Sequence, residues 1–117
     1  MSETMALLVE EFADAVRTWA NEYQSKDAAL SAKRSLDAFM ELRNKYGDRG
    51  RDALKSLLKD SSPYVRSHAA AFLLRHCTSE AVSVLDEVAR GKGMVAFSAR
   101  QALERWKEGT WALDPQP

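Results

Sequence analysis

Residues 54–74 read LKSLLKDSSPYVRSHAAAFLL, and this stretch decides the fold class. Apolar side chains recur at three- and four-residue steps on both sides of Ser62-Pro63, which is the spacing of amphipathic helices. Serine accepts orphan amide protons at a helix start, and the preset φ of proline suits the first helical turn. The stretch therefore predicts two paired helices, one over 52–59 and the next from Pro63 to about His76.

Two longer helices are predicted before this pair. The first covers residues 3–24, and the second follows the N-cap candidate Asp27 and ends at Gly47, a residue that suits a left-handed helix end. Together they predict an antiparallel hairpin, followed by a polar turn over 48–50. The apolar stripes comprise Met5, Leu8, Val9, Phe12, Val16, Trp19, Ala20 and Tyr23 in the first helix, and Leu30, Ala32, Leu36, Phe39, Met40 and Tyr46 in the second.

Two more helices are predicted after the pair. Thr78 or Ser79 caps one helix, which runs through Arg90, and the other covers 95–108 and stops at Gly109, with a break over 91–93. No segment alternates apolar and polar residues as a strand does. The expectation is an all-α fold of about six helices in one domain: a hairpin over 1–47, two helix pairs over 48–109, and a tail over 110–117.

The two helix pairs are related by an internal repeat. Leu54 and Val84 lie 30 positions apart, and further apolar positions match at the same shift. Such units stack because each pair buries only one side of itself, so we expect a short α-solenoid with the hairpin as its third layer and the fourth helix at its centre. The other matched positions are Leu58 and Val88, Val65 and Val95, Ala69 and Ala99, and Leu73 and Leu103.

The run Leu57-Leu58-Lys59-Asp60, followed by Pro63 and Val65-Arg66, resembles the HEAT repeat. The wider stretch over 54–106, with GMVAFSA at 93–99 and LERW at 103–106, is similar to a small bacterial family known as domain of unknown function 2019. The HEAT resemblance implies structural roles for Asp60 and Arg66, which would fix the angle between paired helices.

The second repeat departs from the HEAT pattern. Arg90 stands where Asp60 would recur, and Ala96 stands where Arg66 would recur. We therefore expect the second pair to act as a terminal cap of the stack.

Cysteine usage and hydropathy predict a cytoplasmic protein. The single cysteine, Cys77, cannot close an internal disulfide, and its presence fits a reducing compartment. The longest apolar run near the start, over 5–9, is shorter than a secretory signal requires, and no segment approaches membrane-spanning length. The expectation is a soluble protein without membrane contact.

The residue pattern favours a protein without enzymatic activity, cofactor or metal. His68 and His76 lie eight positions apart, more than two helical turns, so they do not form a chelating pair of the HExxH kind. A polar or helix-terminal histidine and a buried thiol at Cys77 explain these residues better. The sequence contains no GxGxxG, GxxxxGK[ST] or GxSxG motif.

A basic cluster is the first candidate binding feature. Residues 28–76 carry ten basic and five acidic residues, whereas residues 1–27 carry two basic and six acidic ones, within a net charge of zero. Arg51, Lys55 and Lys59 recur every fourth position and would form a ridge on a continuous α-helix. A solvated surface is the preferred interpretation, followed by a site for an acidic protein partner, and then by a nucleic-acid backbone site.

Aromatic and arginine residues near the repeat ends are the second candidate feature. Trp106 is expected to close the core and Trp111 to fold back over it as a lid, because both have large apolar areas. The alternative is a protein-binding surface built from Tyr64 and Trp111 with Arg75 and Arg105, since aromatic and arginine side chains dominate interface energies.

These patterns together favour a non-enzymatic helical-repeat module that binds another protein. Nucleic-acid backbone binding through the basic ridge is the alternative. A role as an inhibitor or immunity partner of a toxin follows only from analogy between folds. The residues that carry the prediction are Arg51, Lys55, Lys59, Tyr64, Arg75, Arg105 and Trp111 for the partner, and Asp60 and Arg66 for the repeat.

Overall fold

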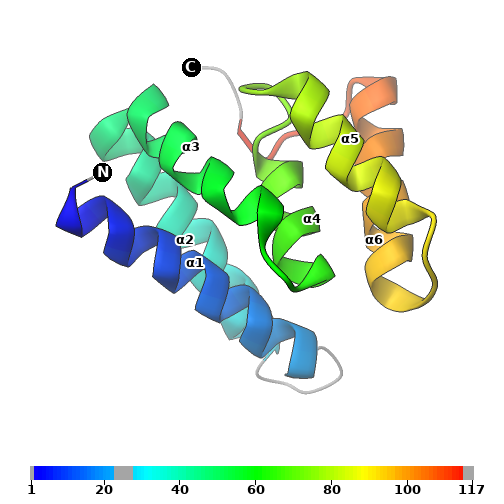
Figure 1. The fold of residues 1–117 in the computed structure, drawn as a ribbon, viewed down its shortest axis with the longest axis horizontal. Helices are drawn as coiled ribbons and strands as arrows, with labels where there is room; N and C mark the ends of the chain where they lie inside the picture. The colour runs from blue at the N-terminus through cyan, green and yellow to red at the C-terminus, as the bar shows by residue number, and fades with distance from the viewer. Residues whose placement is uncertain (1, 23–27, 115–117) are drawn as a thin grey trace. The chain divides into compact units, whose positions relative to one another are not determined.

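The computed structural model describes residues 2–22 and 28–114, and over these ranges all of the regular secondary structure is helical (Figure 1). The all-α prediction is confirmed, and no strand occurs in the described ranges. The elements are α1 (Glu3–Glu22), α2 (Ala28–Tyr46), α3 (Asp48–Leu54), the 3-10 helix η1 (Lys55–Lys59), α4 (Pro63–Phe72), α5 (Thr78–Ala89) and α6 (Gly93–Glu108).

The chain divides into two compact units, Met1–Leu57 and Leu58–Pro117. The first unit contains α1, α2 and α3, and the second contains α4, α5 and α6. The boundary lies inside η1, within the first of the two helix pairs predicted over 48–109. The prediction of one domain with a core shared between the hairpin and the helix pairs stays a prediction.

The first unit is built on the antiparallel pair α1 and α2, which lie side by side in Figure 1. The stripe predicted for α1 is confirmed at Phe12 and Val16, which are buried with Phe39 and Leu42 of α2. Tyr23 and the N-cap candidate Asp27 lie outside the described residues.

The stripe predicted for α2 is only partly correct. Leu30 and Leu36 are exposed, whereas Ser31 and Ser35 are buried. Small side chains let two helix backbones approach closely, and a serine hydroxyl can be satisfied locally. Ser35 Oγ, for example, donates to the carbonyl oxygen of Ala32 at 2.8 Å.

The polar turn predicted over 48–50 is instead the first turn of α3. Gly47 has a positive φ, at 61°, but its ψ of −132° lies outside the predicted left-handed helical region, and α3 begins at the next residue. Gly50 is buried where α3 crosses α2, and a Cβ atom added there would lie 2.2 Å from the carbonyl oxygen of Leu42. Glycine at this position therefore permits a close helix crossing, a role that its sequence neighbours do not reveal.

The second unit packs α4 against both α5 and α6, which also contact each other. Ser62 caps α4 as predicted, since its Oγ accepts from the amide of Val65 at 3.4 Å and Pro63 occupies the first turn. Ala69 of α4 and Ala99 of α6 are both buried, as close helix packing requires. The helix ends at Phe72 rather than at His76, and residues 73–76 form turns.

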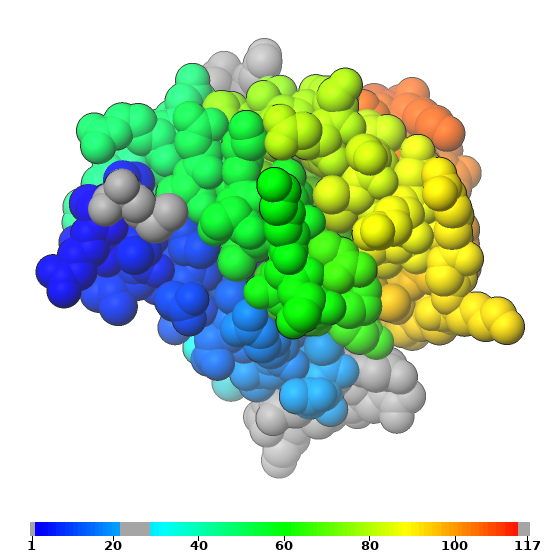
Figure 2. Space-filling view, viewed as in Figure 1, coloured from blue at the N-terminus to red at the C-terminus, as the bar shows by residue number. Residues whose placement is uncertain are grey.

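The remaining helix ends follow the sequence signals only in part. The predicted N-cap at Thr78 or Ser79 is wrong, because α5 already begins at Thr78 and its N-cap residue is Cys77. The predicted stop of α6 at Gly109 is confirmed, and this glycine has φ 78° in the left-handed region. The break between α5 and α6 covers residues 90–92 rather than 91–93, because α5 ends at Ala89 and α6 begins at Gly93. This turn lies at the surface and is yellow in Figure 2. Among the helices of the described ranges, none combines the length and apolarity needed to cross a lipid bilayer.

Candidate binding surfaces

The basic cluster is interrupted by a change of helix type. Arg51 lies on α3, whereas Lys55 and Lys59 lie at the two ends of η1. In a 3-10 helix, residues three apart share a face, so the four-residue spacing on which the ridge depends is broken between Lys55 and Lys59. Arg51 is also half-buried, and its Nη1 lies 2.9 Å from Asp48 Oδ1 in an ion pair. The structure thus holds Arg51 in a local contact.

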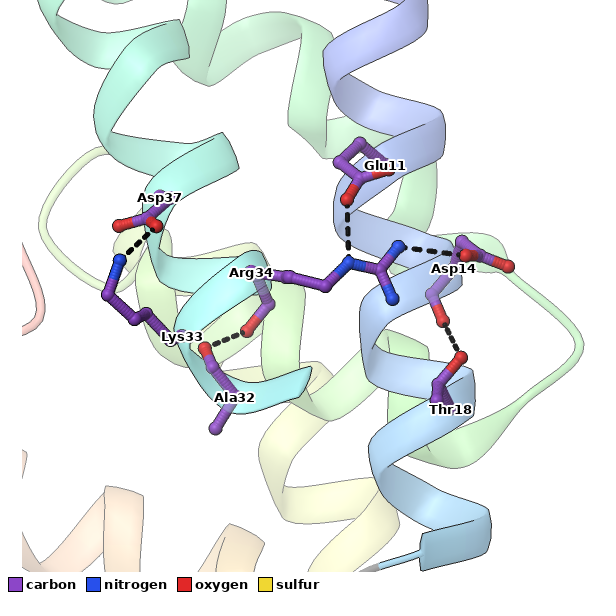
Figure 3. A network of polar contacts seen from close by, with 8 residues as sticks. Glu11, Asp14, Thr18, Ala32, Lys33, Arg34 and Asp37 are labelled. Atoms are coloured by element: carbon purple, nitrogen blue, oxygen red, sulfur yellow. Dashed lines mark hydrogen bonds and ion pairs between the residues drawn. The ribbon is translucent and has the colours of Figure 1, made fainter. Parts of the chain in front are cut away.

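A charged network joins the two long helices of the first unit (Figure 3). The Arg34 guanidinium on α2 reaches α1, with Nε 2.8 Å from Glu11 Oε1 and Nη2 3.0 Å from Asp14 Oδ2. The hydrogen bond with Glu11, followed by that with Asp14, raises the pKa of Arg34 above its ordinary value. Lys33 and Asp37 form a separate pair along α2, at 2.8 Å. Two acids of the N-terminal segment are therefore paired within the hairpin itself.

Asp60 and Arg66 organise the turn that leads into α4. Asp60 Oδ2 accepts from the amide of Ser62 at 3.0 Å, as an Asx turn requires. Arg66 Nη1 donates to the carbonyl oxygens of Asp60, at 2.9 Å, and of Ser61, at 3.2 Å. Arg66 Nε also lies 3.5 Å from Glu87 Oε1, so the arginine connects this turn to α5.

The C-terminal segment lies over α4 with Trp111 inward. Trp111 is buried, at 8% exposure, and its Nε1 donates to the carbonyl oxygen of Ala71 at 2.8 Å. Its ring meets Trp106 edge to face, with centroids 5.3 Å apart. The guanidinium of Arg75 stacks over the Trp111 ring at 5.2 Å and donates to the carbonyl oxygen of Asp114. This geometry matches the lid arrangement, and it places Arg75 and Trp111 together in one internal cluster.

The other two predicted contact residues lie apart from each other on the second unit. Tyr64 is half-buried in the first turn of α4, and its carbonyl oxygen accepts from Ser67 Oγ at 3.3 Å and lies 3.1 Å from His68 Nδ1. Arg105 is exposed near the end of α6, and its carbonyl oxygen accepts from the amide of Thr110 at 2.9 Å. Trp111 is buried and Arg75 is half-buried against it, so the four aromatic and arginine residues are not presented together as one exposed surface.

A different surface, missed by the sequence analysis, lies at the start of α6. Met94 and Phe97 are 43% and 51% exposed, and Arg90, Lys92 and Arg100 beside them are exposed too. We call these five residues the α6 patch. The signal was present in the sequence, because residues 88–103 contain three bases and no acid. Periodicity alone did not reveal it, since apolar residues at helical spacing are usually assigned to the core.

The titratable side chains of the described residues do not gather into a metal site. In residues 2–22 and 28–114, no group of three or more His, Cys, Asp or Glu side chains is placed to hold a metal ion. Burial lowers the pKa of His68, with a partial opposing effect from its hydrogen bond to the carbonyl of Tyr64. Its surroundings therefore disfavour the charged imidazolium.

Comparisons with known proteins give no match: no family model, no curated protein and no solved structure matches this chain. The resemblances to the HEAT repeat and to domain of unknown function 2019 therefore stay predictions.

Proposed function

We propose that this chain is a non-enzymatic helical module that binds another protein through its second unit. The supporting observation is the exposure of Met94 and Phe97 on α6, 43% and 51% respectively. Single exposed apolar residues are common, but two large ones at i and i+3 share a helix face and present a joined apolar surface. Truncating such side chains at an interface removes much of the binding energy.

The proposed architecture of this module is HEAT-like. Support comes from the turn before α4, where Asp60 and Arg66 bind the backbone as the resemblance implies. Further support comes from Ala69 and Ala99, which occupy the same position in the first and second sequence repeat and are both buried.

The single Cys77 supports a reducing compartment, and we propose the cytoplasm.

Affinity capture with the full chain tests the proposed function. We expect the native host to yield a stoichiometric protein partner, identified by mass spectrometry, that is lost with the double variant Met94→Ser/Phe97→Ser. The matched control is Leu30→Ser/Leu36→Ser, which removes two exposed leucines from α2 of the first unit. Equal recovery with both double variants contradicts binding through α6, and recovery of nucleic acid alone contradicts a protein partner.

A further inference from the structure

The α6 patch combines apolar and basic side chains at one end of a helix. Met94 and Phe97 lie on the side of α6 opposite the core positions Ala96 and Ala99, which are buried. The same helix therefore packs against its own unit through small residues and presents two large ones outward. Phe97, at 51% exposure, is the more exposed of the pair.

The charged side chains nearest to the pair in sequence, over residues 88–103, are all basic. Arg90, Lys92 and Arg100 are exposed, and none of the three has a carboxylate partner among the residues that the structure describes. Arg100 Nη1 instead donates to the carbonyl oxygen of Ala89 at 2.8 Å, which holds its guanidinium at the end of α5, next to Arg90. By contrast, Arg34, Arg51 and Arg66 all reach acids of the chain.

The nearest acid along this face of α6 is Glu104, about two turns beyond Phe97. The patch also lies at the N-terminal, positive end of α6, where Lys92 forms no side-chain cap. Side-chain charge and helix dipole thus have the same sign here. An occupant that brings negative charge around an apolar anchor complements both properties.

We propose that the α6 patch binds an acidic segment of a partner protein, one that presents a large apolar side chain flanked by Asp or Glu. The apolar anchor packs against Met94 and Phe97, and the flanking carboxylates face Arg90, Lys92 and Arg100. This inference rests on the proposed function and specifies the chemistry of the partner.

A protein segment fits this surface better than an anionic membrane or a nucleic acid. Membrane binding by a helix scales with the apolar area that it inserts, and the opposite side of α6 is committed to the core through Ala96 and Ala99. Phosphate backbone binding uses the bases but leaves Met94 and Phe97 without a role.

Selection from a random-peptide phage library on the full chain tests the inference. We expect enriched peptides to carry an excess of Asp and Glu around Leu, Phe or Trp. In fluorescence anisotropy titrations, Phe97→Ser and the double variant Arg90→Glu/Lys92→Glu should each raise the Kd of the best peptide about tenfold or more. Lys107→Glu, at an exposed site in the last turn of α6, is the charge control and should leave Kd within about twofold.

The possible failures are distinguishable. One outcome is that the enriched peptides require Phe97, lack an acidic excess and bind the Arg90→Glu/Lys92→Glu variant normally. This outcome overturns the acidic-segment inference and leaves the proposed function standing. Peptides that bind all patch variants equally overturn both. A third outcome is that no peptide is enriched, while the chain co-sediments with vesicles of phosphatidylcholine and phosphatidylserine and Phe97→Ser does not. This outcome contradicts a protein partner and indicates that the α6 patch binds a membrane surface. Circular dichroism on every variant verifies that the helices are retained.

Discussion

The indole Nε1 of Trp111 donates a hydrogen bond to the backbone carbonyl of Ala71, 40 residues earlier in the chain, at 2.8 Å. This bond joins the segment after α6 to the last turn of α4. Arg75 adds a second connection by stacking over the Trp111 ring and donating to the carbonyl oxygen of Asp114. A residue near the chain's end is therefore part of the core of the second unit.

Trp111→Ala should lower the free energy of unfolding by about 3 to 5 kcal/mol, because the change removes a buried indole and its packing against Trp106. Urea unfolding followed by circular dichroism measures the loss. Trp111→Phe keeps much of the apolar contact while removing the donor to Ala71, so its loss should be clearly smaller. An unchanged unfolding midpoint for Trp111→Ala would mean that the segment is not a lid.

Gly50→Ala should destabilise the chain by about 1 to 3 kcal/mol, although alanine is the better helix former. The added methyl would lie 2.2 Å from the carbonyl oxygen of Leu42, so α3 and α2 would have to separate. Gly91→Ala is the control, because its Cβ would meet nothing closer than the Val88 carbonyl oxygen at 3.3 Å. Thermal unfolding of both variants makes the comparison, and a Gly50 variant as stable as the parent would contradict the close crossing.

Ala70→Glu should reduce stability by about 3 kcal/mol or more, because a carboxylate would be placed at a site with no solvent exposure on α4. Ala32→Glu on α2 makes the same substitution at an exposed site, and there we expect a change within about 0.5 kcal/mol. Chemical denaturation of both variants is the measurement. A loss near zero for Ala70→Glu would reject burial of this face of α4.

Stability should fall as the pH is lowered through the titration range of His68. Burial lowers its pKa in the folded state below the ordinary value of 6.5, so the unfolded chain binds more protons between the folded-state and unfolded-state pKa values. The contribution of the neutral imidazole is complete above about pH 6.5 and declines as the pH falls from there toward the folded-state pKa.

Urea unfolding at several pH values between about 7.5 and about 5.5 tests this dependence. His68→Gln should flatten the slope over that range, because glutamine does not titrate. A His68→Gln variant with the slope of the parent would assign the pH dependence to other groups.

The candidate sites illustrate how tertiary contacts change the meaning of a sequence pattern. Trp111 and Arg75 have the composition of a binding hot spot, yet they contact each other inside the second unit. Met94 and Phe97 have the spacing of core residues, yet they are exposed. The sequence shows the residue types and their spacing in both cases. Which side of each helix faces solvent depends on the neighbouring helices that pack against it.

Local chemistry by itself predicted the number of long helices and several of their ends. The apolar steps of α1, the Ser62-Pro63 start of α4 and the Gly109 stop of α6 all depend on residues within a turn or two of one another, so they could be read without a structure. Only the tertiary structure decided that Ser31 and Ser35, rather than Leu30 and Leu36, form the buried side of α2, and that Gly50 admits the backbone of Leu42. These features depend on the shape of the neighbouring helix that packs at each position. The apolar periodicity of a single helix does not contain that information.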